Sequence, residues 1–292
     1  MGRLHRKAGR LELAQQAFAR VESHHGDDVE MSAQALVELA KLAEESGDLA
    51  QALDHAQELL ARHGDLSKWR RQARRWIRRL ASRLAEDLTI RGETGMAIKV
   101  LDQLLAQEPD DLLAHRRRID LLAARGLAER SVAEYEALVE ARPGDDGACY
   151  LYGLSLTYLG EGNLAEALTW VHRALLLNAQ LAFAHQTRGW IFEQMARKGD
   201  RENALQKAAE SYQAALSLLD LRANPRAEAD LLLNLGNVSY ALGDQRKAHQ
   251  YYKRRQAIEI PFLAKARRLV FLEQFGRSAF LADEPMDAIS AF

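Results

Sequence analysis

The sequence predicts an all-α chain built from repeated helix pairs. Three observations indicate this: stretches with helical spacing of apolar residues recur along the 292 residues, glycines separate them, and a small residue follows each glycine by about five positions. The clearest copy runs from Leu231 to Tyr252, where one stretch ends at Gly243-Asp244 and the next begins. The chain is therefore expected to form antiparallel helix pairs stacked in chain order.

The glycines and small residues have separate structural roles in this pattern. Glycine accepts the left-handed conformation that ends a helix, and an Asp or Asn after it can cap the next helix. The small residue lets the two helices of a pair approach closely, and an apolar or aromatic residue four positions later fills the space beside it. The glycines are Gly9, Gly47, Gly92, Gly126, Gly162, Gly199 and Gly243, the small residues are Ala14, Ala52, Ala97, Ser131, Ala167, Ala204 and Ala248, and the packing residues are Phe18, Leu101, Tyr135, Val171 and Tyr252.

The repeats are expected to form one continuous solenoid over residues 1–292, because only 5 prolines are present and the glycines sit at repeat turns instead of in a linker. Pro109 and Pro143 each end a repeat and are 34 residues apart. Partial repeats at both ends indicate a fragment of a longer protein, or exposed ends. The expected boundaries are 1–28 (partial), 33–66, 67–110, 112–145, 148–181, 182–222 (enlarged), 229–262 and 269–292 (partial).

The third repeat departs from the others because its first helix is extended. Residues 66–77 add about eleven positions, and no Gly or Pro lies between Leu66 and Arg91. We expect a helix of about 26 residues, roughly 39 Å long, that protrudes beyond its neighbours. Its outer face is basic, with no acidic residue between 66 and 83, and carries Lys68, Arg70, Arg71, Arg74, Arg75, Arg78, Arg79 and Arg83.

Three interpretations of this basic face remain open. It can be a solvated face whose charge is balanced by nearby acids such as Glu44, Glu45, Asp48, Asp110 and Asp111. It can instead bind an acidic protein partner or a neighbouring segment, since like charges on one helix repel unless something anionic is close. The third interpretation is binding to nucleic acid or anionic lipid.

The repeated pattern resembles the tetratricopeptide repeat (TPR) family, whose period is 34 residues. The resemblance covers nearly the whole chain and implies a right-handed superhelix of antiparallel helix pairs, about seven repeats counting the partial ends. In that family the first helix of each pair lines a concave groove, and its second, fifth, ninth and twelfth positions usually contact the ligand.

Carried onto this sequence, those positions make the groove polar at one end and aromatic at the other. The polar end holds Arg79, Ser82, Glu86, Arg116 and Asp120. At the aromatic end, Cys149, Glu193 and Phe280 occupy such positions together with the predicted binding residues. Large aromatics on a concave surface suit peptide anchoring, although they can also pack between neighbouring helices. The predicted binding residues are Tyr152, Leu156, Phe183, Gln186, Trp190, Leu233, Asn237 and Tyr240.

Composition excludes several classes of function. Lysine plus arginine (40) and aspartate plus glutamate (41) nearly cancel, so the whole-molecule charge does not point to nucleic acid. No apolar run is long enough to span a membrane, the N-terminal residues lack a signal-peptide core, and Cys149 is the single cysteine. The sequence leaves the localisation open and favours the cytoplasm slightly over the periplasm.

No catalytic constellation or cofactor motif is present. His24-His25 beside Asp27-Asp28 could ligate a metal, but this stretch is more simply an exposed loop between repeats, so no metal is predicted. The sequence therefore predicts a non-enzymatic scaffold that binds a peptide or helix of a protein partner, which can be acidic. Two alternatives stay open: nucleic-acid or anionic-surface binding through the basic helix, and a regulatory arm of an enzyme whose catalytic domain lies outside this chain.

Overall fold

The computed structural model describes residues 6, 11–24, 28–197, 200–220, 224–258, 275, 278–279 and 281–282. All regular structure in these residues is helical, which confirms the predicted all-α class of antiparallel helix pairs. None of the described helices is both long enough and apolar enough to cross a lipid bilayer. The chain divides into two units, Met1–Gly126 and Leu127–Phe292. Because the division falls inside the predicted repeat 112–145, a single continuous solenoid stays a prediction.

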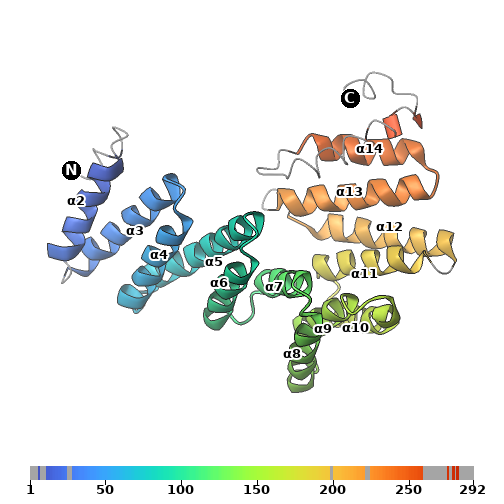
Figure 1. Cartoon of the computed structure of the whole chain (residues 1–292), viewed down its shortest axis with the longest axis horizontal. Helices are drawn as coiled ribbons and strands as arrows, with labels where there is room; N and C mark the ends of the chain where they lie inside the picture. Colours follow the sequence, from blue (N-terminus) through green and yellow to red (C-terminus); the bar gives the residue numbers. More distant parts are fainter. Residues whose placement is uncertain are drawn as a thin grey trace. The chain divides into compact units, whose positions relative to one another are not determined.

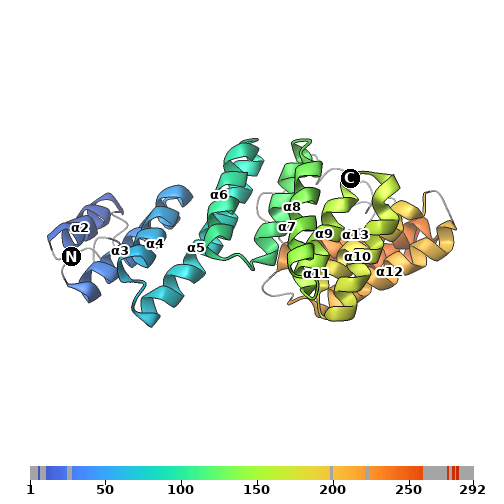
Figure 2. The ribbon, with the colours of Figure 1, turned by 90° about the horizontal axis from the view of Figure 1, so that it is seen from below.

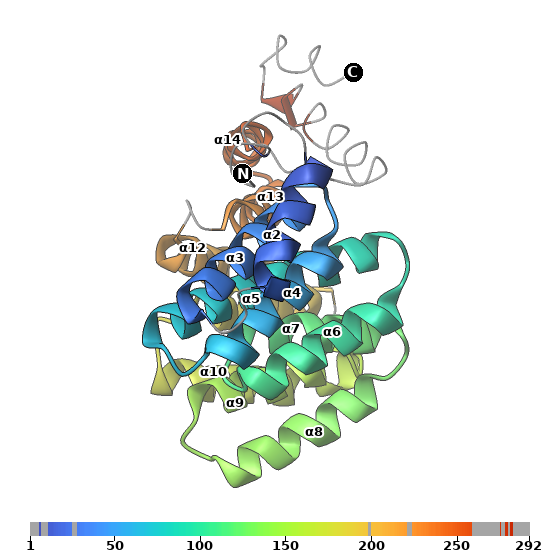
Figure 3. The same ribbon diagram turned by 90° about the vertical axis from the view of Figure 1, so that its left-hand side faces the viewer.

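The first unit consists of consecutive helices that each pack on the next, in chain order (Figures 1 and 2). They share one hydrophobic core running from α3 to α7, in which Leu36, Leu59, Leu80 and Leu101 are fully buried. Figure 3 shows α2 lying beside α3 at the start of this unit. The helices are α2 (Leu11–His24), α3 (Val29–Glu45), α4 (Leu49–His63), α5 (Ser67–Ile90), α6 (Thr94–Gln107) and α7 (Leu112–Ala124).

The second unit repeats this arrangement, each α-helix packing on the next. A core joins α11, α12 and α13 through Tyr212, Leu231 and Leu235. Phe275 packs on Ala248 and Tyr252 of the last helix. The helices are α8 (Ala128–Ala141), α9 (Asp146–Thr157), the 3-10 turn η1 (Glu161–Asn163), α10 (Leu164–Leu177), α11 (Ala182–Met195), α12 (Arg201–Leu218), α13 (Pro225–Ala241) and α14 (Gln245–Gln256).

The turn chemistry is confirmed at most repeats. Gly47 and Gly243 have φ of 84° and 82°, which lie in the left-handed region. Gly92 and Gly126 also lie in this region. The carboxylates of Asp48, Asp200 and Asp244 accept hydrogen bonds from the backbone N–H three residues later, capping α4, α12 and α14. Gly9 and Gly199 lie outside the described residues.

The prediction for Gly162-Asn163 is wrong. The left-handed glycine after α9 is Gly160, with φ of 104°, and Gly162 lies in the 3-10 turn. Asn163 makes no side-chain capping hydrogen bond to α10. The reason is that α9 ends at Thr157, so the chain must turn earlier and reaches α10 through η1.

Six of the seven predicted small residues are fully buried where the helices of a pair meet: Ala14, Ala52, Ala97, Ser131, Ala167 and Ala248. Ala204 is only partly buried, which corrects that assignment. Its place is taken by Ala208, which is fully buried and lies four residues before the buried Tyr212. The extra turn of the 18-residue α12 therefore precedes the packing position.

The extended helix is confirmed as α5, which has 24 residues and is about 36 Å long. Its added segment is packed, since Trp69, Ala73 and Trp76 are buried in the same core as Leu80 and Leu84. The basic side chains therefore project from the opposite side of a helix that is anchored along its whole length.

Candidate interaction surfaces

Two helix pairs of the second unit are held together by a tyrosine ring packed on a glycine. A Cβ added at Gly236 would lie 2.2 Å from the ring of Tyr252, and one at Gly189 would lie 2.7 Å from the ring of Tyr212. These glycines were not singled out by the sequence pattern because they lie inside helices and not at turns. Helix propensity could have identified them. A glycine inside a helix destabilises it by about 1 kcal/mol relative to alanine, so its presence there indicates a packing reason.

The hydroxyl groups of the same tyrosines reach two of the predicted groove residues. Tyr212 donates to Oε2 of Glu193 at 2.9 Å, and Tyr252 donates to Oδ1 of Asn237 at 2.7 Å. Burial raises the pKa of Glu193, whereas its hydrogen bond from Tyr212 lowers it. The rings thus order the first helices of both pairs, and the Asn237 amide nitrogen makes no hydrogen bond to a described residue.

The predicted groove residues differ in their exposure. Trp190 and Tyr240 are 37% and 39% exposed, whereas Tyr152 and Leu156 are only 5% and 3% exposed. The remaining four are half-buried: Phe183, Gln186, Leu233 and Asn237. Among the predicted groove residues that the structure describes, the exposed aromatics are therefore those of α11 and α13.

The burial of Tyr152 has a local cause. Residues 148–157 of the short helix α9 are all buried, so this helix presents almost no free face. The Tyr152 ring packs edge-on against Trp170, with 5.1 Å between ring centroids, and its hydroxyl donates to Glu136 at 3.2 Å. Burial, assisted by the charge of Glu136, raises the pKa of Tyr152 to about 12. Cys149 on the same helix is buried, and burial raises the pKa of its thiol.

The basic face of α5 is partly neutralised by α3. Lys68 pairs with Glu30 at 2.9 Å, near the start of α3, and Arg79 pairs with Glu44 at 2.6 Å, near its end. Arg83 also pairs with Glu44. The two helices therefore lie alongside each other over almost the full length of α3.

On its other side α5 meets the α6–α7 connection. Arg78 pairs with Asp111 at 3.1 Å and with Glu108 at 3.3 Å, and Arg74 reaches Glu108 at 3.5 Å. Asp111 is the N-cap of α7, so α7 begins at the level of Arg78. The first eleven residues of α5, 67–77, consequently extend beyond the start of α7, as predicted, but on the other side they lie alongside α3 and do not protrude beyond it.

These ion pairs support the first interpretation for most of the basic face, because five of its eight basic residues have carboxylate partners, with Glu44 and Asp111 among the acids. Arg70 donates to the backbone carbonyls of Gly64 and Asp65. Arg71 donates to the Ser67 carbonyl at 3.3 Å, and Arg75 has no partner among the described residues. Arg71 and Arg75, which we call the basic tip, are exposed and have no described carboxylate beside them.

No group of three or more His, Cys, Asp or Glu side chains that could hold a metal occurs in the part of the chain that the structure describes. The side chain of His24, together with His25 and Asp27, lies outside it, as does Phe280. Asp28 has a structural role, since its carboxylate accepts a hydrogen bond from the Met31 N–H and caps α3.

A model of the tetratricopeptide repeat family matches residues 1–66 and 91–146. Over these residues the chain carries tetratricopeptide repeats. The gap between the two matched segments, residues 67–90, coincides with α5, and residues 147–292 also lie outside the match. A TPR fold is typically a non-catalytic scaffold, and its presence here suggests a role in protein–protein interaction.

Solved structures show the same fold. A TPR protein from Parabacteroides merdae is 15% identical, with a TM-score of 0.56 over 95% of each chain. The human IFIT1 dimer with PPP-AAAA is 13% identical, with a TM-score of 0.55 over 99% of this chain and 74% of that one. A curated DNA ligase from Sphingopyxis alaskensis is 29% identical over 169 residues, which is 58% of this chain. The similar region spans 22% of that ligase.

Proposed function

We propose that this TPR chain is a non-enzymatic scaffold that binds an extended peptide or a helix of a partner protein on the first helices α11 and α13. The proposal rests above all on the exposure of Trp190 and Tyr240. Tryptophan and tyrosine are enriched among the residues that dominate binding energy at protein interfaces. Each of the two first helices also carries a glycine packed against a tyrosine ring, Gly189 in α11 and Gly236 in α13. This packing holds both helices in place, so the two exposed aromatics form a rigid surface with little ordering cost on binding.

The half-buried residues on these helices add polar and apolar contacts. The amide N–H₂ of Asn237 has no hydrogen-bond acceptor among the described residues, since Tyr252 uses only the amide oxygen. Such a donor suits a peptide carbonyl, and the rings of Trp190 and Tyr240 suit apolar side chains. The partner surface expected here is therefore a short segment with one or two apolar anchors.

Replacing both exposed aromatics by alanine is expected to weaken peptide binding by about thirtyfold or more, the loss typical of an interface hot spot. Peptides would first be selected on the wild-type chain by display, and their dissociation constants then measured by fluorescence anisotropy on the Trp190→Ala/Tyr240→Ala variant. Leu176→Ala is the matched control, since Leu176 is an apolar residue 75% exposed on the second helix α10. Unchanged affinity in the aromatic variant would refute the proposed surface.

The basic tip gives a second contact surface, suited to an acidic partner segment. The favourable observation is that Arg71 and Arg75 project without described carboxylates from a helix segment that extends past α7. The similarity to a protein named a DNA ligase makes DNA the alternative anionic partner. The formal net charge of the chain is −1, so either partner would be held by this local patch and not by the whole-molecule field.

Charge reversal in Arg71→Glu/Arg75→Glu is expected to reduce binding of a glutamate-rich peptide at least about tenfold at 50 mM salt. The control Arg91→Glu/Arg125→Glu changes the net charge equally at exposed positions of the same unit and is expected to change the affinity less than about twofold. Anisotropy with labelled peptide and with nicked duplex DNA, at 50 and 200 mM salt, separates the partners. DNA binding that is tighter than peptide binding, and that falls steeply with salt, would replace the acidic-peptide assignment by nucleic-acid binding.

A further inference from the structure

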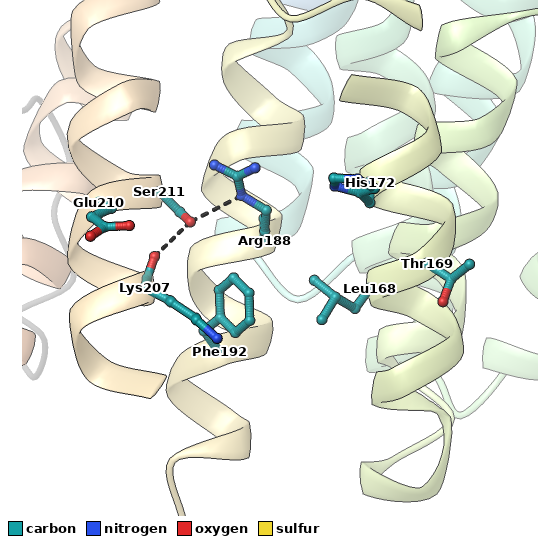
Figure 4. Close-up of a pocket in the computed structure, with 8 residues that line it drawn as sticks. All are labelled: Leu168, Thr169, His172, Arg188, Phe192, Lys207, Glu210 and Ser211. Atoms are coloured by element: carbon teal, nitrogen blue, oxygen red, sulfur yellow. Dashed lines mark hydrogen bonds between the residues drawn. The ribbon is translucent and has the colours of Figure 1, made fainter. Parts of the chain in front are cut away.

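A cavity of about 500 Å³ lies between the second helices α10 and α12, and side chains of α11 also line it (Figure 4). Leu168 and Phe192 form apolar walls, and Arg188 and Lys207 bring two cationic groups to the same space. The Lys207 ammonium lies 5.8 Å from the centre of the Phe192 ring. The cavity thus combines an apolar wall with local positive charge.

Arg188 is held in place without an ion pair to a described carboxylate, although the charge of Glu210 acts on it from a greater distance. Its Nε donates to Oγ of Ser211 at 3.1 Å, and that hydroxyl donates to the carbonyl of Lys207 at 2.7 Å. Its Nη2 lies 3.2 Å from Nδ1 of His185, whose Nε2 lies 2.9 Å from the carbonyl of Ala179. The two contacts are consistent with one neutral tautomer, in which Nε2 donates and Nδ1 accepts.

Three of the five N–H groups of this guanidinium therefore remain without a described acceptor. Burial lowers the pKa of Arg188, which shows that its charge is partly removed from water. Glu210 also lines the cavity but forms no ion pair with Arg188 or Lys207 within the described residues. With one carboxylate against two cations, the cavity keeps an excess of positive charge.

The same local sequence occurs seventy residues earlier, where the arginine has a different partner. Ala114-His115 and Arg118 of α7 match Ala184-His185 and Arg188 of α11, and His115 contacts the Pro109 carbonyl at 2.8 Å as His185 contacts that of Ala179. There the arginine has a carboxylate, because Arg118 pairs with Asp102 of the preceding helix at 2.5 Å.

At the position that corresponds to Asp102, the second copy has His172, which lines the cavity. The carboxylate that Arg118 receives from its own chain is therefore missing beside Arg188. Figure 4 shows His172 on α10 across the cavity from Arg188 on α11. His172 supplies no carboxylate at this position, and the cavity beside it is open to a ligand.

We propose that this cavity binds a carboxylate joined to an apolar group. The carboxylate pairs with Arg188 where an aspartate stands in the earlier copy, Lys207 adds charge, and the apolar group lies against Leu168 and Phe192. The planar fork of a guanidinium fits a carboxylate closely. A free organic acid and the C-terminal carboxylate of a peptide share this chemistry.

The test is a calorimetric or NMR titration of the full chain with benzoate, N-acetyl-phenylalanine and its neutral amide. Both acids are expected to bind the wild type and the amide at least about tenfold more weakly. Tighter binding of N-acetyl-phenylalanine than of benzoate assigns the site to a peptide terminus, and the reverse assigns it to a free acid. Equal binding of acids and amide would overturn the proposal.

Two variants keep the assignment to Arg188 falsifiable. His172→Asp restores the carboxylate of the earlier copy, so it is expected to occupy Arg188, abolish acid binding and raise the unfolding temperature. Arg188→Gln is expected to weaken acid binding at least tenfold, whereas Arg201→Gln, at an exposed position on α12, leaves it unchanged. Acid binding by His172→Asp equal to that of the wild type would show that the ligand lies elsewhere.

Discussion

Replacing Gly236 by alanine is expected to lower the free energy of unfolding of the second unit by about 1–3 kcal/mol, the usual cost of overpacking. Helix propensity alone predicts the opposite sign, because alanine stabilises a helix interior by about 1 kcal/mol relative to glycine. The packing effect wins because the new Cβ would lie 2.2 Å and 2.5 Å from two carbons of the Tyr252 ring. That ring is fully enclosed and its hydroxyl is bonded to Asn237, so it cannot simply rotate away.

The measurement is the shift in denaturation midpoint followed by circular dichroism. Gly95→Ala is the matched control, since a Cβ there meets only the flexible end of Arg125 at 3.4 Å. The control is expected to be neutral or stabilising by up to about 1 kcal/mol. If Gly236→Ala raised the midpoint as Gly95→Ala does, the close contact between α13 and α14 would not exist in solution.

The contrast between Gly243 and Gly236 explains how much of the fold could be predicted. Turn glycines such as Gly243 interrupt the apolar pattern and precede a capping residue, so local sequence identifies them. Gly236 differs from its surroundings only through Tyr252, which lies sixteen residues later and on another helix. The helices and most turns were therefore predictable, whereas the tightest contacts between helices depend on pairs that no local pattern reveals.

The same distinction applies to the interaction surfaces. The length of α5 was predictable because its apolar stripe is unbroken, but the partners of its arginines lie far along the sequence on other elements, as Glu44 and Glu108 do. Helix position alone placed Tyr152 and Trp190 together in a groove, yet their exposure differs because α9 is enclosed and α11 is not. The cavity at Arg188 had one available signal, the repeated Ala-His-x-x-Arg segment, whose meaning depends on the residue that faces it.

The Arg118–Asp102 pair provides a direct measure of what that facing residue contributes. Replacing Asp102 by asparagine is expected to destabilise the first unit by about 1–3 kcal/mol, because the arginine is only 7% exposed and loses the negative charge of Asp102. The loss stays below the 3–5 kcal/mol typical of a fully buried pair, since Asp102 itself is 45% exposed. The change is isosteric, so a lower denaturation midpoint reports the charge and not the shape.

Asp87→Asn is the matched control, because Asp87 pairs with Arg91 one helical turn away at an exposed site, where such a pair contributes about 0.3–0.5 kcal/mol. Equal midpoints for the two variants would mean that burial of Arg118 does not strengthen its pairing. A clear difference would show that an arginine in this position depends on a carboxylate. By the same physics, Arg188, which occupies the corresponding position without one, retains the capacity to bind a carboxylate from outside the chain.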